Sequence, residues 1–191
     1  RAIQNLLNIE PDDGLNAILR LRGLDDEEFV NSHNVVFATK NGTIKKTSLE
    51  AYSRPRANGV FAINIAEGDE VVDVRLTNGK NEIIMANKNG RAVRFNEETV
   101  RAMGRTATGV RGMKLDGDDD QVVGMIVVND AETENVMVVS ETGYGKRSSV
   151  EDYRVTNRGG KGVKTLNITE KTGRVVAIKN VNDDNDLMII N

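Results

Sequence analysis

The stretch Gly162-Val-Lys-Thr-Leu-Asn-Ile168 is one of three copies of a single phrase, and this phrase decides the fold. The other copies are Gly109-Val-Arg-Gly-Met-Lys-Leu115 and Gly59-Val-Phe-Ala-Ile-Asn-Ile65. Their opening glycines are 50 and 53 residues apart. Self-similarity at such a period is typical of stacked or radial supersecondary units that bury their apolar faces against one another. We therefore predict a repeat array.

A second spacing recurs in the same three units. A turn glycine is followed four residues later by a cation, and the three cations are Lys46, Arg94 and Arg147. Equivalent positions of a repeat fold face the same way. This spacing predicts that the three cations line one outer edge and form a curved positive track.

Each unit contains the pattern of four short strands. In the second unit we expect strands at 82–86, 91–95, 111–115 and 122–128, the second of them basic and alternating. The dipeptides Asn41-Gly42 and Asn89-Gly90 predict two-residue hairpin turns between the first two strands of a unit. Four antiparallel strands in about 50 residues are the content of a propeller blade, so the predicted class is all-β.

The repeats divide the chain into one repeat-built domain, 1–191. We expect complete blades at 35–81, 82–134 and 135–185, a partial blade and loop at 1–34, and the first strand of a further blade at 186–191. Residues 25–32 are predicted to be an exposed loop between units. The absence of a starting methionine indicates a piece of a longer protein.

Charge is segregated within the repeats. The net charge is −3, yet residues 91–114 hold six cations and two acids, and residues 144–164 hold the same numbers. Residues 116–134 hold seven acids and no base. Local fields, more than net charge, steer a polyanion. If equivalent segments share one rim, the sequence predicts a basic band on an acidic body.

Composition also restricts location and chemistry. Apolar runs such as Met125–Val128 are too short to span a membrane, and the first residues lack a signal peptide's apolar region. The chain has no cysteine and one histidine, His33, with no triad pattern near it. We expect a cytoplasmic location, no catalytic site, no metal site and no cofactor.

Several phrases of the repeats resemble the C-terminal domain of DNA gyrase A subunits. The resemblance spans essentially the whole chain and is strongest at 38–47, 93–104, 108–112 and 143–147. Arg158-Gly-Gly-Lys-Gly162 matches part of the family's Gln-Arg-Arg-Gly-Gly-Lys-Gly box, with Thr156 and Asn157 in place of its first two residues. The resemblance implies that the full box lies upstream, in a first blade.

The resemblance implies a β-pinwheel, a propeller-like disc whose blades exchange strands and whose basic rim wraps double-stranded DNA. It implies a role in ATP-dependent negative supercoiling near the bacterial nucleoid, in a complex of the rest of the A subunit with the ATPase B subunit. The paralogous subunit of topoisomerase IV is the alternative within this family. A protein-docking propeller is a second alternative, and an enzyme on a propeller scaffold is a remote third.

The residues expected to contact DNA are cations of the second strands and of the loops around the second glycine, together with two loop glycines. Phosphates are neutralised by such cations, and glycines allow backbone N–H groups to approach them closely. The predicted set is Lys45, Lys46, Arg54, Arg56, Arg91, Arg94, Arg105, Arg111, Lys146, Arg147, Arg158, Gly159, Gly160, Lys161 and Lys164.

Overall fold

The structure is a computed structural model that describes residues 27–52 and 65–182. In chain order its elements are α1 (Glu27–Ser32), β1 (Asn34–Thr39), β2 (Thr43–Ser48), η3 (Leu49–Tyr52), β3 (Val71–Thr77), β4 (Glu82–Asn87), β5 (Arg91–Asn96), η4 (Glu97–Thr99), β6 (Val110–Arg111), β7 (Val122–Val128), β8 (Asn135–Ser140), β9 (Gly145–Ser149), η5 (Val150–Asp152), β10 (Val163–Lys164) and β11 (Val175–Val181). The η elements are short 3₁₀ helices. The prediction of an all-β chain is confirmed.

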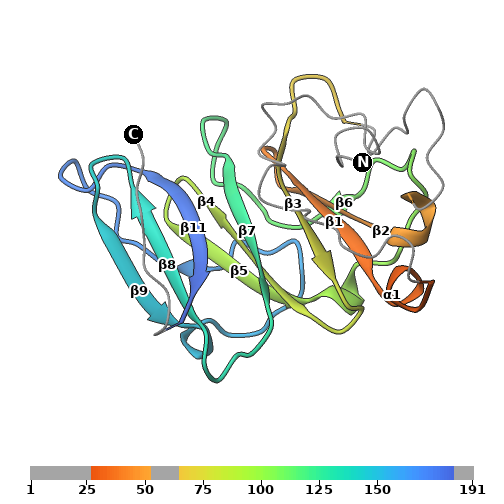
Figure 1. Ribbon diagram of the computed structural model, residues 1–191. Coiled ribbons are helices and arrows are strands. Elements are labelled where there is room, and N and C mark those ends of the chain that lie inside the picture. The colour runs from red at the N-terminus through yellow and green to blue at the C-terminus, as the bar shows by residue number, and fades with distance from the viewer. Residues whose placement is uncertain (1–26, 53–64, 183–191) are drawn as a thin grey trace.

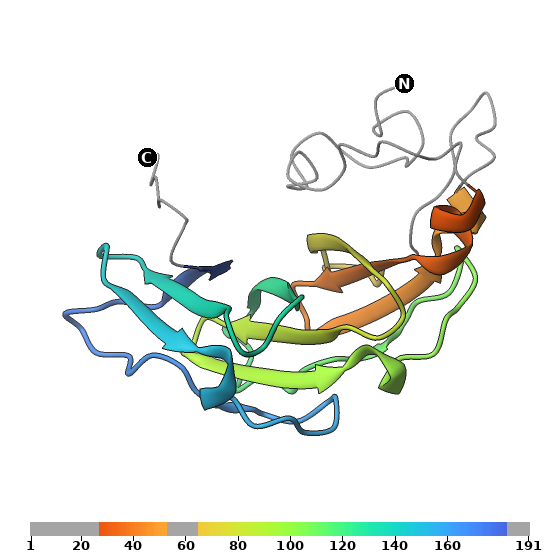
Figure 2. The same cartoon turned by 60° about the horizontal axis from the view of Figure 1, so that its bottom comes forward.

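Three antiparallel sheets lie side by side (Figure 1). Their strand orders are β3-β1-β2-β6, β10-β5-β4-β7 and β11-β8-β9. Turned by 60°, the sheets form a curved row (Figure 2), and β3, β7 and β11 pack against one another along it. This is the propeller-like arrangement that the repeats predict.

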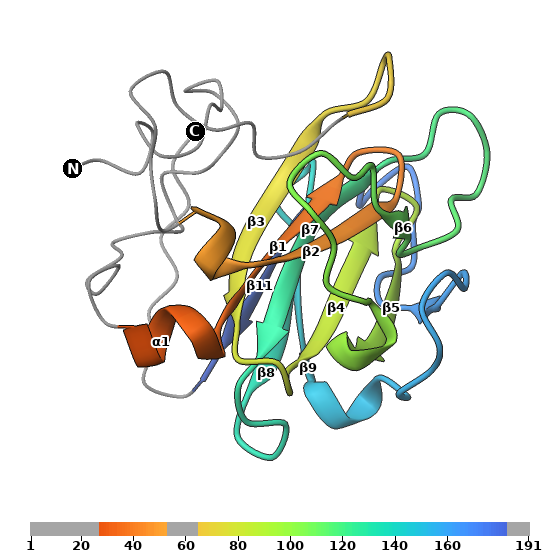
Figure 3. The same ribbon diagram turned by 90° about the vertical axis from the view of Figure 1, so that its right-hand side faces the viewer.

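The outermost strand of a sheet is supplied by the following unit. In the first sheet β6 pairs with β2, Thr43 opposite Arg111, and in the second sheet β10 pairs with β5, Arg91 opposite Lys164 (Figure 3). The exchange implied by the resemblance is therefore present. The third sheet has three described strands and ends at β9, the left-hand edge in Figure 1.

These outermost strands are shorter than predicted. The segment expected to form a strand at 111–115 contributes only Val110–Arg111. Directly after β6, the N–H groups of Gly112 and Met113 both donate to the carbonyl of Gly42. Directly after β10, those of Thr165 and Leu166 both donate to the carbonyl of Gly90. The chain leaves the sheet here because it turns to pair with the preceding unit's hairpin.

The core lies between neighbouring sheets. Ile83 and Met85 pack toward the first sheet, whereas Ile84 and Ala86 pack toward the third. Successive side chains of a strand point to opposite faces, so a strand covered on both faces is apolar at nearly every position. The uninterrupted apolar run of β4 follows from this burial.

Two local predictions were wrong. The hairpin loops contain three residues, because β1 ends at Thr39 and β2 begins at Thr43, and among the residues described only glycines have positive φ.

The segment predicted to be an exposed loop contains α1, whose Val30 is buried and whose Phe29 ring stacks on His33. Glu27 and Glu28 in its first turn suit the positive end of the helix. Among the described residues no helix is long and apolar enough to cross a membrane.

Candidate nucleic-acid interface

Lys46 does not face solvent. Its residue is 7% exposed, and its Nζ donates to the carbonyl of Glu97 at 3.0 Å and lies 3.6 Å from the Glu97 carboxylate. Glu97 is fully buried and also accepts from the Thr77 hydroxyl and the Asn81 N–H. The ammonium is thus enclosed by polar groups of the next unit.

Arg94 is buried in the equivalent place. Its guanidinium pairs with Glu82 at 2.5 Å, and its Nη1 donates to the carbonyls of Val150 and Tyr153 at 3.0 and 2.9 Å. Val150 begins η5 as Glu97 begins η4. The same interaction therefore recurs: the repeat cation of one unit binds the first carbonyl of the 3₁₀ helix in the next.

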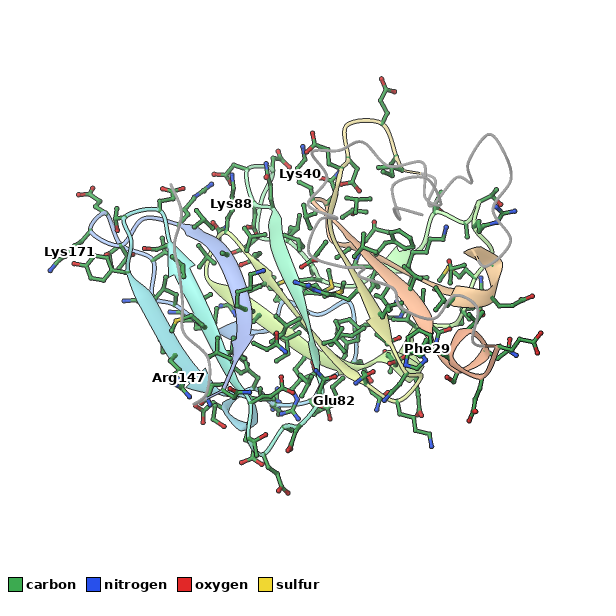
Figure 4. The ribbon with its side chains drawn as sticks, in the orientation of Figure 1. Phe29, Lys40, Glu82, Lys88, Arg147 and Lys171 are labelled. Carbon is green, nitrogen blue, oxygen red and sulfur yellow. The ribbon has the colours of Figure 1, made fainter. Side chains whose placement is uncertain are left out.

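Arg147 differs from both. It is exposed on β9, at the end of the row of sheets (Figure 4). The prediction that the three repeat cations form one outer track is therefore wrong for Lys46 and Arg94, which lie inward beside carboxylates. The alternation of β2 and β5 is typical of a solvated face, but the 3₁₀ turn of the following unit covers that face.

Lys45 is also enclosed. Its residue has no exposed surface, its Nζ donates to the carbonyl of Arg105, and it lies 5.9 Å from the centre of the Phe37 ring. Burial, with a smaller effect from Arg105, lowers the pKa of Lys45 to about 8. The equivalent residue of the second unit is the buried Val93. Lys45 is thus placed in a packed interior.

The loop that carries the box-like sequence lies across the second unit. The Gly159 N–H donates to the Gly112 carbonyl at 2.7 Å, and the Gly160 carbonyl accepts from the Lys114 N–H at 2.9 Å. Arg158 donates to the carbonyls of Thr99 and Arg111 at 2.9 and 3.1 Å. The Gly159 N–H is thus bonded within the protein, and its expected approach to a phosphate stays a prediction.

These contacts gather cations from two units around one loop. Arg91 Nη1 donates to the Gly162 carbonyl at 3.1 Å, and Arg91 is the register partner of Lys164. Arg111, Lys114, Lys161 and Lys164 are exposed, whereas Arg91 and Arg158 are half-buried. We name this group the rim cluster: Arg91, Arg111, Lys114, Arg158, Lys161 and Lys164.

A hollow of about 440 Å³ lies under the loop. Four cations line it, Arg94, Arg154, Arg158 and Lys161, together with the loop glycines and with Ala92 and Val93 of β5. Arg94 is already paired with Glu82, and the other three cationic side chains at one concave surface favour a negatively charged group such as a phosphate.

Two cations of the interface were missed from the sequence. Lys114 lies inside the phrase that begins at Gly109, where the other copies have asparagine, and Arg154 follows the buried Tyr153. Their positive charge was the available signal, but only the loop's path shows that they lie beside Lys161 and Arg158.

The other predicted residues lie elsewhere. Lys146 is exposed on β9. Arg105 is half-buried in the loop whose carbonyl accepts from Lys45. Arg54 and Arg56 lie outside the described residues. No contact described here tests which of the predicted residues bind DNA, and that assignment stays a prediction.

An acidic turn borders the rim cluster. Asp116 lies 3.5 Å from Lys161, and Asp119 pairs with Arg174 at 2.5 Å. The hydrogen bond and charge of Arg174 lower the pKa of Asp119. Both ion pairs join the second unit to the third.

Comparison with known families gives a match to the model described as "DNA gyrase C-terminal domain, beta-propeller", at residues 33–78, 81–129 and 134–182. The chain is 43% identical over 188 residues to the DNA gyrase A protein of Staphylococcus aureus strain NCTC 8325 / PS 47. This match covers 98% of the chain and 21% of that relative, so the chain spans about a fifth of the relative's length.

Two solved structures resemble this fold. The C-terminal domain of DNA topoisomerase IV superposes with a TM-score of 0.78 at 27% identity, over 96% of this chain and 55% of that one. The C-terminal domain of DNA gyrase A superposes with a TM-score of 0.70 at 28% identity, over 81% of this chain and 50% of that one.

Proposed function

The chain belongs to the DNA gyrase C-terminal domain family, and from this premise we propose that it binds and bends double-stranded DNA along the rim cluster. The observation that carries the proposal is the placement of the loop at 156–162. It brings four exposed cations of two units, Arg111, Lys114, Lys161 and Lys164, to one junction.

The chemistry of the cluster suits a phosphate backbone. Duplex DNA carries closely spaced phosphates, and each one neutralised by Lys or Arg releases condensed counterions. Lys46 and Arg94 are already bonded to carboxylates and carbonyls of the protein, so we leave them, with the buried Lys45, outside the proposed DNA surface.

The proposed contact is with duplex DNA of any sequence. Stacking of unpaired bases requires exposed aromatic platforms. In the described part of the chain, Tyr144 is the only aromatic side chain among the exposed large apolar residues. Contacts made by lysine and arginine to phosphates carry no base information.

Bending requires several such contacts together. Bending a 20–30 bp site through 40–90° costs roughly 1–6 kcal/mol by elastic estimates. One phosphate contact is not enough, whereas cations supplied by successive units along a curved row of sheets act together. The arc in Figure 2 supports this arrangement.

We propose that the parent protein is the A subunit of a bacterial DNA gyrase, a type II topoisomerase in the cytoplasm at the nucleoid. In this proposal the domain supports ATP-dependent negative supercoiling by a complex of the rest of the A subunit with the ATPase B subunit. The 43% identity to a gyrase A protein favours gyrase over topoisomerase IV.

Closure of nicked plasmid by ligase tests the proposal. We expect circles sealed with the chain present to keep a changed linking number after the protein is removed. We also expect duplexes of unrelated sequence to bind equally, more tightly than single strands, with affinity that falls steeply as salt rises. Unchanged linking number with no duplex binding would contradict the proposal. Recovery of a stoichiometric protein partner in its place would favour a protein-docking propeller.

A further inference from the structure

One cation of the rim cluster already has a carboxylate beside it. Lys161 Nζ lies 3.5 Å from Asp116 Oδ1, and the two side chains are 52% and 51% exposed. Lys161 belongs to the loop of the third unit and Asp116 to the acidic turn of the second. The ion pair therefore lies on the surface that a DNA phosphate would approach.

Asp116 is held in place by its backbone. Its N–H donates to Asp120 Oδ2 at 2.9 Å, and its carbonyl accepts from Asn89 Nδ2 at 3.3 Å. Asp120 is only 3% exposed and accepts from Asn87 Nδ2 at 2.8 Å. Hydrogen bonds to Asn89 and to the buried Asp120 thus fix the backbone of Asp116 near Lys161.

The pair is not a consequence of the repeat. The residue after the shared phrase is Ala66 in the first unit, Asp116 in the second and Thr169 in the third. The residue before the phrase is Thr108 in the second unit and Lys161 in the third. Asp116 and Lys161 thus occupy positions at which the equivalent described residues of the other units are uncharged. The repeat fold alone therefore does not require this ion pair.

We propose that Asp116 competes with DNA phosphate for Lys161 and so lowers the affinity of the rim cluster for duplex DNA. This inference rests on the proposed function. When DNA binds, a phosphate oxygen takes the place of the carboxylate at the ammonium. The ion pair stabilises the free protein and is lost in the complex, so it weakens binding.

The expected effect is modest. An exposed ion pair is worth about 0–1 kcal/mol, which limits the gain from removing Asp116 to about five-fold in affinity. Lys161 is then free to neutralise a phosphate fully, so the dependence of log affinity on log salt becomes steeper by up to about one.

The test compares Asp116→Asn with Asp118→Asn in the full 191-residue chain. Asp118 is an exposed carboxylate of the same turn, so its replacement changes the net charge equally. Affinity for one duplex is measured by fluorescence anisotropy from low to moderate salt, and a thermal melt confirms folding. Each substitution is also made in a chain that carries Lys161→Gln. Asp116→Ala serves as a second variant that removes the carboxylate.

We expect Asp116→Asn and Asp116→Ala to tighten binding about two- to five-fold, more than Asp118→Asn, and we expect Lys161→Gln to abolish this gain. The inference is overturned if Asp116→Asn gains no more than Asp118→Asn, or if the gain persists with Lys161→Gln. Failure of the unaltered chain to bind duplex DNA would instead overturn the proposed function, and this inference with it.

Discussion

Arg94 of the second sheet donates a hydrogen bond from Nη1 to the carbonyl oxygen of Val150, 3.0 Å away at the start of η5 in the third unit. The same relationship joins Lys46 to Glu97 one unit earlier. The basic residue repeated in these two units therefore joins neighbouring blades, and the proposed DNA surface lies on the loops outside it.

Replacing Arg94 by Met should destabilise the fold. The substitution leaves Glu82 without its counter-charge and frees two carbonyls at the blade junction. We expect a loss of about 3 kcal/mol in the free energy of unfolding, measured by urea denaturation. Arg147→Met is the matched control, and it should cost less than about 1 kcal/mol because Arg147 is exposed. Equal losses would contradict a fastening role for Arg94.

Replacing Lys46 by Met should cost about 3–5 kcal/mol, because it leaves the fully buried Glu97 carboxylate without a cation. Adding Glu97→Leu should recover part of this loss, since Leu49 occupies the equivalent position of the first unit and is buried there. Urea denaturation of both single variants and the double variant gives the coupling. A double variant as unstable as the sum of the two single losses would rule out direct coupling.

The fold was predictable because its signal is repeated. Three copies of the phrase beginning at Gly59, Gly109 and Gly162 predict an array, and the pattern of four short strands in each unit predicts an all-β fold. What could not be predicted was which cations the next unit covers. Alternation along β5 gives Arg94 the pattern of a solvated residue, and only the position of η5 shows that it is buried.

The candidate site was predictable in part for the same reason. Arg111, Arg158, Lys161 and Lys164 were named from the sequence, because they flank or lie in the recurrent glycine phrases. Their convergence with Lys114 depends on the hydrogen bonds of Gly159 and Gly160 to the second unit. Such contacts between residues about 47 positions apart leave no local pattern.

Lys45 should make stability depend on pH. Burial lowers its pKa from 10.5 to about 8, so folding releases a proton between these two values. Below pH 8 both states are protonated and the penalty for the buried charge is complete. As pH rises above 8, the unaltered chain should gain stability relative to Lys45→Met, because the unfolded state binds more protons. Urea denaturation of both proteins at about pH 7 and about pH 9.5 measures the difference, and a constant difference would contradict it.

Gly90 and Gly143 offer a matched pair at equivalent turns. Their φ values are 82° and 86°, so an alanine at either position bears the left-handed penalty of about 1–2 kcal/mol. At Gly90 the added methyl group would also overlap the Leu166 carbonyl of the next unit, whereas at Gly143 it meets open space in the described structure. Gly90→Ala should therefore cost about 1–3 kcal/mol more than Gly143→Ala in denaturation experiments. Equal losses in the free energy of unfolding would mean that the following unit does not pack tightly against the hairpin turn at Gly90.

The salt dependence of duplex binding by a rim-cluster variant tests the central claim most directly. Each neutralised phosphate contributes about 0.9 to the slope of log affinity against log salt, so Arg111→Gln, Lys161→Gln and Lys164→Gln together should reduce the slope by about 2–3 and weaken binding to every sequence. The control replaces three exposed lysines outside the cluster, Lys80, Lys171 and Lys179, by Gln, and it should leave the slope nearly unchanged. An unchanged slope for the rim-cluster variant, or an equal fall for the control, would contradict the account.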